Sequence, residues 1–169
     1  MGRISPQKAV TDYFFYGTLL DADVRRLVFG PDAEHLTLLP GKLWGYRRMA
    51  KHSSSVPVLV PRPGASVAGL LVRGLDRRQT GRLLHYEGRN YRRMPCAIRL
   101  AGAGAAEAIV YVGARPTPLG RTPWRLDAWQ RRSKRAYLKL AALWLAAYRP
   151  AAYETCCRVR WVKRWAARA

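Results

Sequence analysis

A short segment near the start of the chain combines residue types that can bind an anionic or polar group. Tyr16, Gly17, Thr18 and Leu19 follow an aromatic run typical of a buried strand and precede an amphipathic helical pattern. A glycine turn between a strand and a helix directs successive backbone N–H groups to one point, where a carboxylate, an amide oxygen or a phosphate can bind. Such turns are also common as purely structural features, so this motif alone leaves both interpretations open.

Glu87 is the second candidate, and it lies between Tyr86 and Gly88 at the end of another expected helix. A carboxylate held among aromatic rings can transfer protons as a general acid or base. Burial would raise its pKa, whereas nearby arginines would lower it. The alternative is a structural ion pair with one of Arg82, Arg89, Arg92 and Arg93.

The sequence shows no pattern typical of a metal or cofactor site. Zinc-ligand, phosphate-loop and nucleophile-elbow spacings are absent, and the three histidines, His35, His52 and His85, are scattered. Cys96 stands alone, and Cys156 and Cys157 are adjacent, which fits neither a disulfide framework nor a zinc site. We therefore expect no cofactor, free thiols and a reducing, cytoplasmic location. The sequence also has no secretory-signal pattern and no apolar run near the roughly 20 residues of a membrane span.

The chain is strongly basic, with 31 Lys and Arg against 10 Asp and Glu among 169 residues, a formal net charge of +21. This charge is compatible with nucleic acid, anionic lipid or an acidic substrate as a partner, and equally with a solvated basic surface. Hydrophobic residues make up 49% of the chain, which indicates a globular protein.

Hydrophobic periodicity and turn residues predict a compact, barrel-like α+β domain of short strands with two small helices. Pro63 and Gly64 are expected to form the turn of a hairpin, and Pro57 and Pro61 favour an edge strand. The expected strands are 12–16, 36–48, 56–61, 66–75, 91–100 and 108–112, and the expected helices are 19–29 and 76–87.

The C-terminal part differs in composition, because residues 121–169 hold 13 bases, two acids and five of the six tryptophans. Thr122 and Pro123 are a plausible start for a helix that ends at Pro150, and a second basic, aromatic stretch covers 158–165. We predict a domain at 12–118 and a helical extension at 119–169. Either the extension packs Leu126, Trp129, Leu140 and Trp144 on the barrel, or it binds nucleic acid or anionic lipid.

Four pieces in this order resemble the gamma-glutamylcyclotransferase-like family, including its plant avirulence-induced and gamma-glutamylamine branches. The pieces are Phe14 to Leu19, Gly45 to Arg48, Val58 to Leu71, and Tyr86 to Arg93, within residues 12–113. The resemblance implies a small mixed β-barrel flanked by helices. It also implies that Tyr16 to Leu19 hold a gamma-glutamyl head through backbone groups and that Glu87 is the acid/base residue.

The reaction implied by this resemblance explains why one carboxylate suffices. The α-amine of a gamma-glutamyl amide attacks its own γ-carbonyl, closes a five-membered lactam, 5-oxoproline, and expels the other amine. The nucleophile belongs to the substrate, so neither a catalytic Ser or Cys nor a cofactor is required. Glu87 would relay the proton from the attacking amine to the leaving nitrogen. With this role we expect Glu87 to be buried and the strand that follows to turn Arg92 or Arg93 outward. Glu87→Gln should then abolish turnover and leave thermal stability nearly unchanged. A family member that only binds such a ligand is the remaining alternative.

Overall fold

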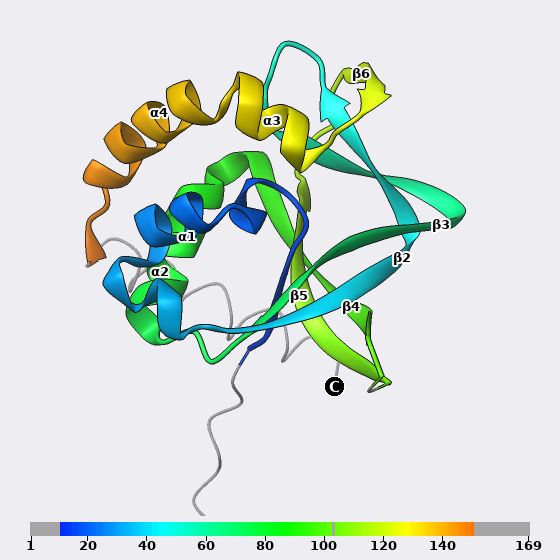
Figure 1. Cartoon of the computed structure of the whole chain (residues 1–169), viewed down its shortest axis with the longest axis horizontal. Helices are drawn as coiled ribbons and strands as arrows, with labels where there is room; N and C mark the ends of the chain where they lie inside the picture. Colours follow the sequence, from blue (N-terminus) through cyan, green and yellow to red (C-terminus); the bar gives the residue numbers. More distant parts are fainter. Residues whose placement is uncertain (1–10, 103, 151–169) are drawn as a thin grey trace, which may run out of the picture.

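The computed structural model describes residues 11–102 and 104–150 as a mixed β-barrel with helices gathered along one side (Figure 1). The α+β barrel expected from the sequence is confirmed. The strands are β1 (Tyr13–Phe15), β2 (Thr37–Lys51), β3 (Pro57–Arg73), β4 (Tyr91–Leu100), β5 (Ala105–Gly113) and β6 (Leu119–Pro123). The α-helices are α1 (Ala22–Phe29), α2 (Arg77–Glu87), α3 (Leu126–Arg132) and α4 (Lys134–Ala146), and short 3-10 helices cover Thr18–Leu20, Pro31–His35 and Gly88–Asn90.

Five of the strands close the barrel, in the order β3-β1-β5-β4-β2, with β2 pairing back to β3. The short β1 lies between β3 and β5, antiparallel to the first and parallel to the second. Its three side chains are all buried, which explains the continuous aromatic run. The sixth strand, β6, pairs with β2 outside the closed ring. The end of β1 is therefore held between two strands of the barrel wall, which fixes the position of the turn that follows it.

The predicted hairpin around Pro63 and Gly64 is wrong, because β3 continues through both residues. It pairs with β2 along almost its whole length, and the chain reverses between these two strands instead. Gly64, with φ 78°, belongs to residues 62–65 of β3, which stand opposite the single residue Gly45 of β2, with φ 81°. These left-handed glycines bend the long strands without reversing them. The turn residues Pro63 and Gly64 thus mark an irregular position within β3 and not the predicted chain reversal.

Gly69 allows β3 to cross β1 at close range. A Cβ atom at this position would overlap the carbonyl oxygen of Phe15 and come within 2.5 Å of the Phe14 ring. We expect Gly69→Ala to lower the free energy of unfolding by about 1–3 kcal/mol, because neither neighbour can move aside. Urea unfolding would measure this change, with Gly113→Ala as the control, since a Cβ there meets only an oxygen at 3.5 Å. Equal stabilities of the two variants would contradict the packing argument.

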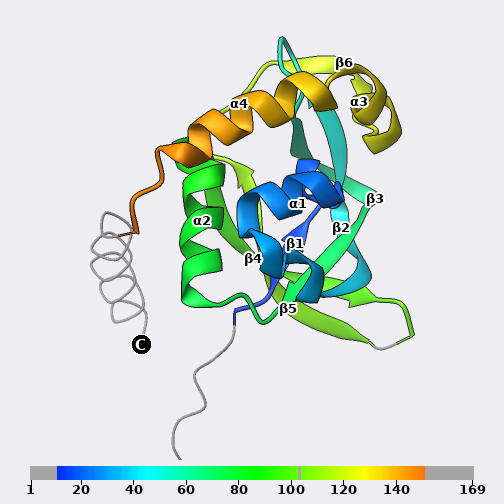
Figure 2. The same ribbon diagram turned by 60° about the vertical axis from the view of Figure 1, so that its left-hand side comes forward.

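The helices cover one side of the barrel, and α4 extends across α1 and α2 (Figure 2). Helix α1 begins at Asp21, whose carboxylate accepts from the N–H groups of Asp23 and Val24. Helix α2 begins with a capping box formed by Asp76 and Gln79. Helix α2 matches the expected helix over 76–87, because its start signal is local. Helix α1 begins later than the expected residue 19, because Thr18–Leu20 forms a 3-10 helix before it.

The C-terminal part departs from the single expected helix. Thr122 and Pro123 belong to β6, the first helix begins at Leu126, and Ser133 separates α3 from α4. Trp129 is buried in the core as expected, whereas Leu140 is 67% exposed and Trp144 is 50% exposed.

The structure does not test the predicted division at 118/119, which remains a prediction. Two features lie outside the described residues: the basic stretch 158–165 and the adjacent Cys156 and Cys157. The binding role predicted for that part of the extension stays a prediction. Across residues 11–102 and 104–150, no helix is long and apolar enough to cross a membrane.

Candidate active site

A cavity of about 210 Å³ lies where the end of β1, the start of β3, the end of α2 and helix α4 meet. Tyr16, Gly17, Thr18 and Leu19 line it together with Glu87. The structure therefore brings together the two candidate segments, which are about 70 residues apart in the sequence. This volume is below the roughly 300–1,000 Å³ typical of sites for drug-sized molecules, so the cavity suits a small metabolite.

The turn after β1 is a 3-10 turn whose first hydrogen bond runs from the Leu20 N–H to the Gly17 carbonyl, at 3.0 Å. The N–H groups of Gly17, Thr18 and Leu19 precede that bond and have no acceptor within the turn. Gly17 packs closely against Pro57, since a Cβ atom there would lie 3.0 Å from the proline ring. The turn can thus present its N–H groups to a polar ligand in the cavity.

The backbone on the strand side of this turn is fixed by β2 and β5. Arg48 donates a hydrogen bond to the Tyr16 carbonyl at 2.6 Å, and its guanidinium lies 5.0 Å from the centre of the Trp124 ring. The hydroxyl of Tyr16 donates to the Tyr111 carbonyl at 2.7 Å. These long-range contacts leave the turn little freedom to move, which is what a binding loop requires.

Glu87 is the last residue of α2, and Gly88, with φ 61°, ends the helix directly after it. A left-handed glycine at this position is a common way to end a helix. Glu87 retains only part of its accessible surface, and it lines the cavity. Burial raises the pKa of Glu87 to about 8. The C-terminal end of a helix also disfavours a negative charge, which acts in the same direction.

None of the described arginines or lysines forms an ion pair with Glu87. Arg82 instead donates to the carbonyls of Val28 and Leu27 at the end of α1, the latter at 2.9 Å. Arg89 and Arg92 are exposed. The ion-pair interpretation therefore has no support in this part of the chain. A carboxylate with a pKa close to neutral pH is well suited to accept and return a proton.

Tyrosines form much of the cavity wall. The hydroxyl of Tyr86 lies 2.7 Å from the Thr18 hydroxyl and 2.5 Å from the Tyr137 hydroxyl. Tyr91 lines the same cavity, and its hydroxyl donates to the Pro57 carbonyl at 3.4 Å. Burial raises the pKa of Tyr86, Tyr91 and Tyr137, so these phenols are neutral at physiological pH. The cavity wall thus offers hydrogen bonds without adding charge.

The sequence motifs did not indicate the roles of four further residues in this site: Arg48, Tyr91, Tyr111 and Tyr137. Arg48 and Tyr91 lie inside two of the family-like pieces, so those pieces carry a signal for both residues. Tyr137 carries no local signal, because its spacing matches an ordinary apolar helix face. Within residues 11–102 and 104–150, no group of three or more His, Cys, Asp or Glu is placed to hold a metal ion.

The protein is a small closed mixed β-barrel in which one carboxylate, Glu87, and a glycine turn line the same cavity. The model of the family described as gamma-glutamyl cyclotransferase, AIG2-like, matches residues 13–131, and the chain belongs to this family. The match continues through β6 and ends at residue 131, near the end of α3 and before α4. No protein with a curated description matches the chain significantly.

Several solved structures share the fold. A protein of Arabidopsis thaliana, known in solution, is 20% identical with a TM-score of 0.56, covering 78% of this chain and 87% of its own. A gamma-glutamyl cyclotransferase is 13% identical with a TM-score of 0.52, covering 83% and 89%. An AIG2-like protein from Mus musculus is 18% identical with a TM-score of 0.51, covering 67% and 87%. At these identities the similarity shows the fold alone.

Proposed function

We propose that this protein is a cofactor-free enzyme that cyclises a gamma-glutamyl amide or peptide to 5-oxoproline and releases the amine. The observation that supports this most directly is the shared cavity, in which Glu87 and the Tyr16–Leu19 turn face the same space. Membership of the gamma-glutamyl cyclotransferase, AIG2-like family supports the same reaction. The proposal includes a cytoplasmic location, because the cysteine spacing fits neither a disulfide framework nor a zinc site.

In the proposed mechanism, the backbone N–H groups of Gly17, Thr18 and Leu19 hold the gamma-glutamyl head in a folded conformation. The neutral α-amine attacks the γ-carbonyl carbon, forming the new C–N bond of the lactam. Ionised Glu87 takes the proton that the attacking nitrogen loses. It then gives that proton to the leaving nitrogen as the original amide C–N bond breaks. The turn also stabilises the developing oxyanion, and holding the substrate folded supplies the orientation that cyclisation needs.

A panel of glutathione, gamma-glutamyl dipeptides and gamma-glutamylamines, assayed for 5-oxoproline and free amine in equal amounts, tests the proposal. We expect at least one class to be converted with no added metal or organic cofactor. Binding of these compounds without conversion would identify a ligand-binding family member instead. Absence of both binding and conversion would contradict the proposed function.

The pKa of Glu87 predicts the pH dependence of the reaction. Since Glu87 must be ionised in the free enzyme to accept a proton, kcat/KM is expected to rise with pH through about 8 and to level off above it. The substrate α-amine titrates in a similar range, so its pKa is measured separately by NMR, and that of Glu87 from its carboxyl 13C shift. A kcat/KM that is constant from pH 6 to 9 would contradict the role of Glu87.

A further inference from the structure

Three hydroxyl groups from separate elements meet at the cavity beside Glu87. They belong to Thr18 in the turn, Tyr86 in α2 and Tyr137 in α4. The Tyr86 hydroxyl is central, at 2.7 Å from that of Thr18 and 2.5 Å from that of Tyr137, and the remaining pair is 3.4 Å apart. Each hydroxyl carries a single proton, so the orientation of one determines which hydrogen bonds the others can make.

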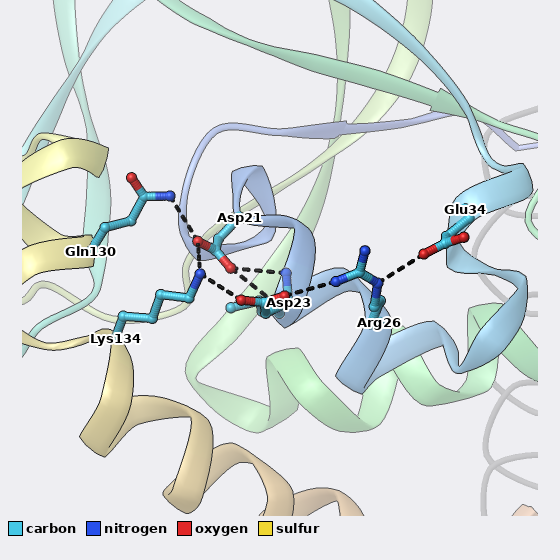
Figure 3. Close-up of polar contacts among 7 residues, drawn as sticks. Asp21, Asp23, Arg26, Glu34, Gln130 and Lys134 are labelled. Carbon is cyan, nitrogen blue, oxygen red and sulfur yellow. Dashed lines mark hydrogen bonds and ion pairs between the residues drawn. The ribbon is translucent and has the colours of Figure 1, made fainter.

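Tyr137 reaches this cluster from α4, which lies beyond the residues matched by the family model. The start of α4 is fixed to the segment that follows the turn, as Figure 3 shows. Lys134 lies 2.8 Å from the Asp21 carboxylate and 2.7 Å from that of Asp23, and Gln130 donates to Asp21 at 2.8 Å. The same stretch of chain is therefore held at Thr18 by Tyr137 and at Asp21 by Lys134.

The other end of α4 is fixed to α2. The indole N–H of Trp144 donates to the His85 carbonyl at 2.8 Å, and the Nε2 atom of His85 lies 2.8 Å from the Trp144 carbonyl. The two rings stack with centroids 4.8 Å apart. Helix α4 thus contacts both elements that carry the proposed site, the turn and the end of α2, and Tyr137 lies between these two attachments.

We propose that α4 completes the site and that Tyr137 is its positioning residue, fixing the hydroxyls of Thr18 and Tyr86 next to Glu87. This inference rests on the proposed function. Without the Tyr137 hydroxyl, the buried Tyr86 hydroxyl keeps only Thr18 as a described partner, and the Thr18 side chain is free to reorient with it. Thr18 belongs to the turn proposed to hold the gamma-glutamyl head, which all substrates share. Loss of the hydroxyl therefore affects every substrate by a similar factor, whatever amine leaves.

The test is Tyr137→Phe in the full chain. This change removes the hydroxyl and keeps the aromatic ring, whose centroid lies 5.3 Å from that of the Trp129 ring. We expect kcat/KM to fall on the order of 10-fold, since small displacements at a cyclising centre are costly. The factor should be the same for glutathione, gamma-glutamylalanine and a gamma-glutamylamine, with little change in Tm. Tyr46→Phe is the matched control, because the Tyr46 hydroxyl contacts only the Met94 sulfur, at 3.8 Å, among the described hydrogen bonds.

A binding measurement separates this inference from the proposed function. Calorimetry with glutathione and gamma-glutamylalanine is carried out on Glu87→Gln, alone and combined with Tyr137→Phe. Weaker binding of both ligands by a common factor in the double variant supports the inference. If the wild type is active, binding and turnover that stay unchanged after loss of the Tyr137 hydroxyl would overturn this inference and leave the proposed function standing. The same conclusion follows if the loss of activity differs with the leaving amine. Failure of Glu87→Gln to bind either ligand, with no turnover by the wild type, would overturn the proposed function and this inference with it.

Discussion

Replacing Glu87 with Gln is expected to reduce 5-oxoproline formation by roughly 10²–10⁴-fold, the usual range for loss of a general acid/base. Gln has nearly the same shape but cannot accept the proton of the attacking amine. Binding of the gamma-glutamyl head should persist, because that role is proposed for the turn. Steady-state rates and calorimetric binding on the same variant measure the two effects separately. Turnover within a few-fold of the wild type would exclude Glu87 as the acid/base residue.

Glu87→Gln is also expected to change the free energy of unfolding, whereas the sequence alone predicted a nearly unchanged stability. The pKa of Glu87 is raised to about 8 in the folded protein, against about 4.3 in an unfolded chain. Between these pH values the folded state binds a proton that the unfolded state lacks, so wild-type stability falls by up to about 1.4 kcal/mol per pH unit as pH rises. Gln removes this loss. Glu87→Gln should match the wild type near pH 4 and exceed it increasingly towards pH 8.

The exposed Glu107 of β5 provides the control for this measurement. Because its side chain is exposed, Glu107→Gln should leave both the turnover and the free energy of unfolding nearly unchanged. A Glu87 that served as a structural ion-pair partner would give the opposite result, because its replacement would then lower stability most at neutral and high pH. The direction of the stability change at pH 8 therefore distinguishes a buried catalytic carboxylate from a structural one.

The sequence predicted the parts of the site that have local signals. The aromatic run before Gly17 indicated a buried strand, and hydrophobic periodicity and turn residues indicated the helix over 76–87 that ends at Glu87. The order of these motifs indicated the family and, through it, the barrel. The shared cavity was then a consequence of the fold, because β1 and α2 end next to each other in it.

Other parts depend on contacts between distant residues and left no local signal. Tyr137 was indistinguishable from an apolar helix-face residue until α4 was placed on α1 and α2. Gly64 and Pro63 had a sequence typical of a reversal, yet pairing of β3 with β2 on both sides of them keeps the strand extended. The break at Ser133 follows from tertiary contacts on both sides, since Trp129 is buried in the core and Lys134 binds Asp21.

Asp21 links the turn to α3 and α4, and its loss is expected to lower the free energy of unfolding by about 2–4 kcal/mol. Its side chain is 1% exposed. Burial by itself would raise its pKa, but hydrogen bonds from Lys134 and Gln130 outweigh burial and hold the pKa below its usual value. Asp21→Asn is the informative variant, because Asn is an equally good helix cap and therefore tests mainly the contacts to Lys134 and Gln130.

Asp23→Asn is the matched control, since Asp23 shares Lys134 but its side chain is 45% exposed. An exposed pair contributes less than about 1 kcal/mol, so this variant should remain close to the wild type. Because the pKa of Asp21 is lowered in the folded state, its contribution is present above the unfolded pKa of about 3.9 and is lost as pH falls through the folded value. The stability difference between Asp21→Asn and the wild type should therefore be largest at neutral pH and shrink in acid. Equal unfolding of Asp21→Asn and Asp23→Asn at pH 7 would show that α4 is held without Asp21, and Tyr137 would then owe its position to other contacts.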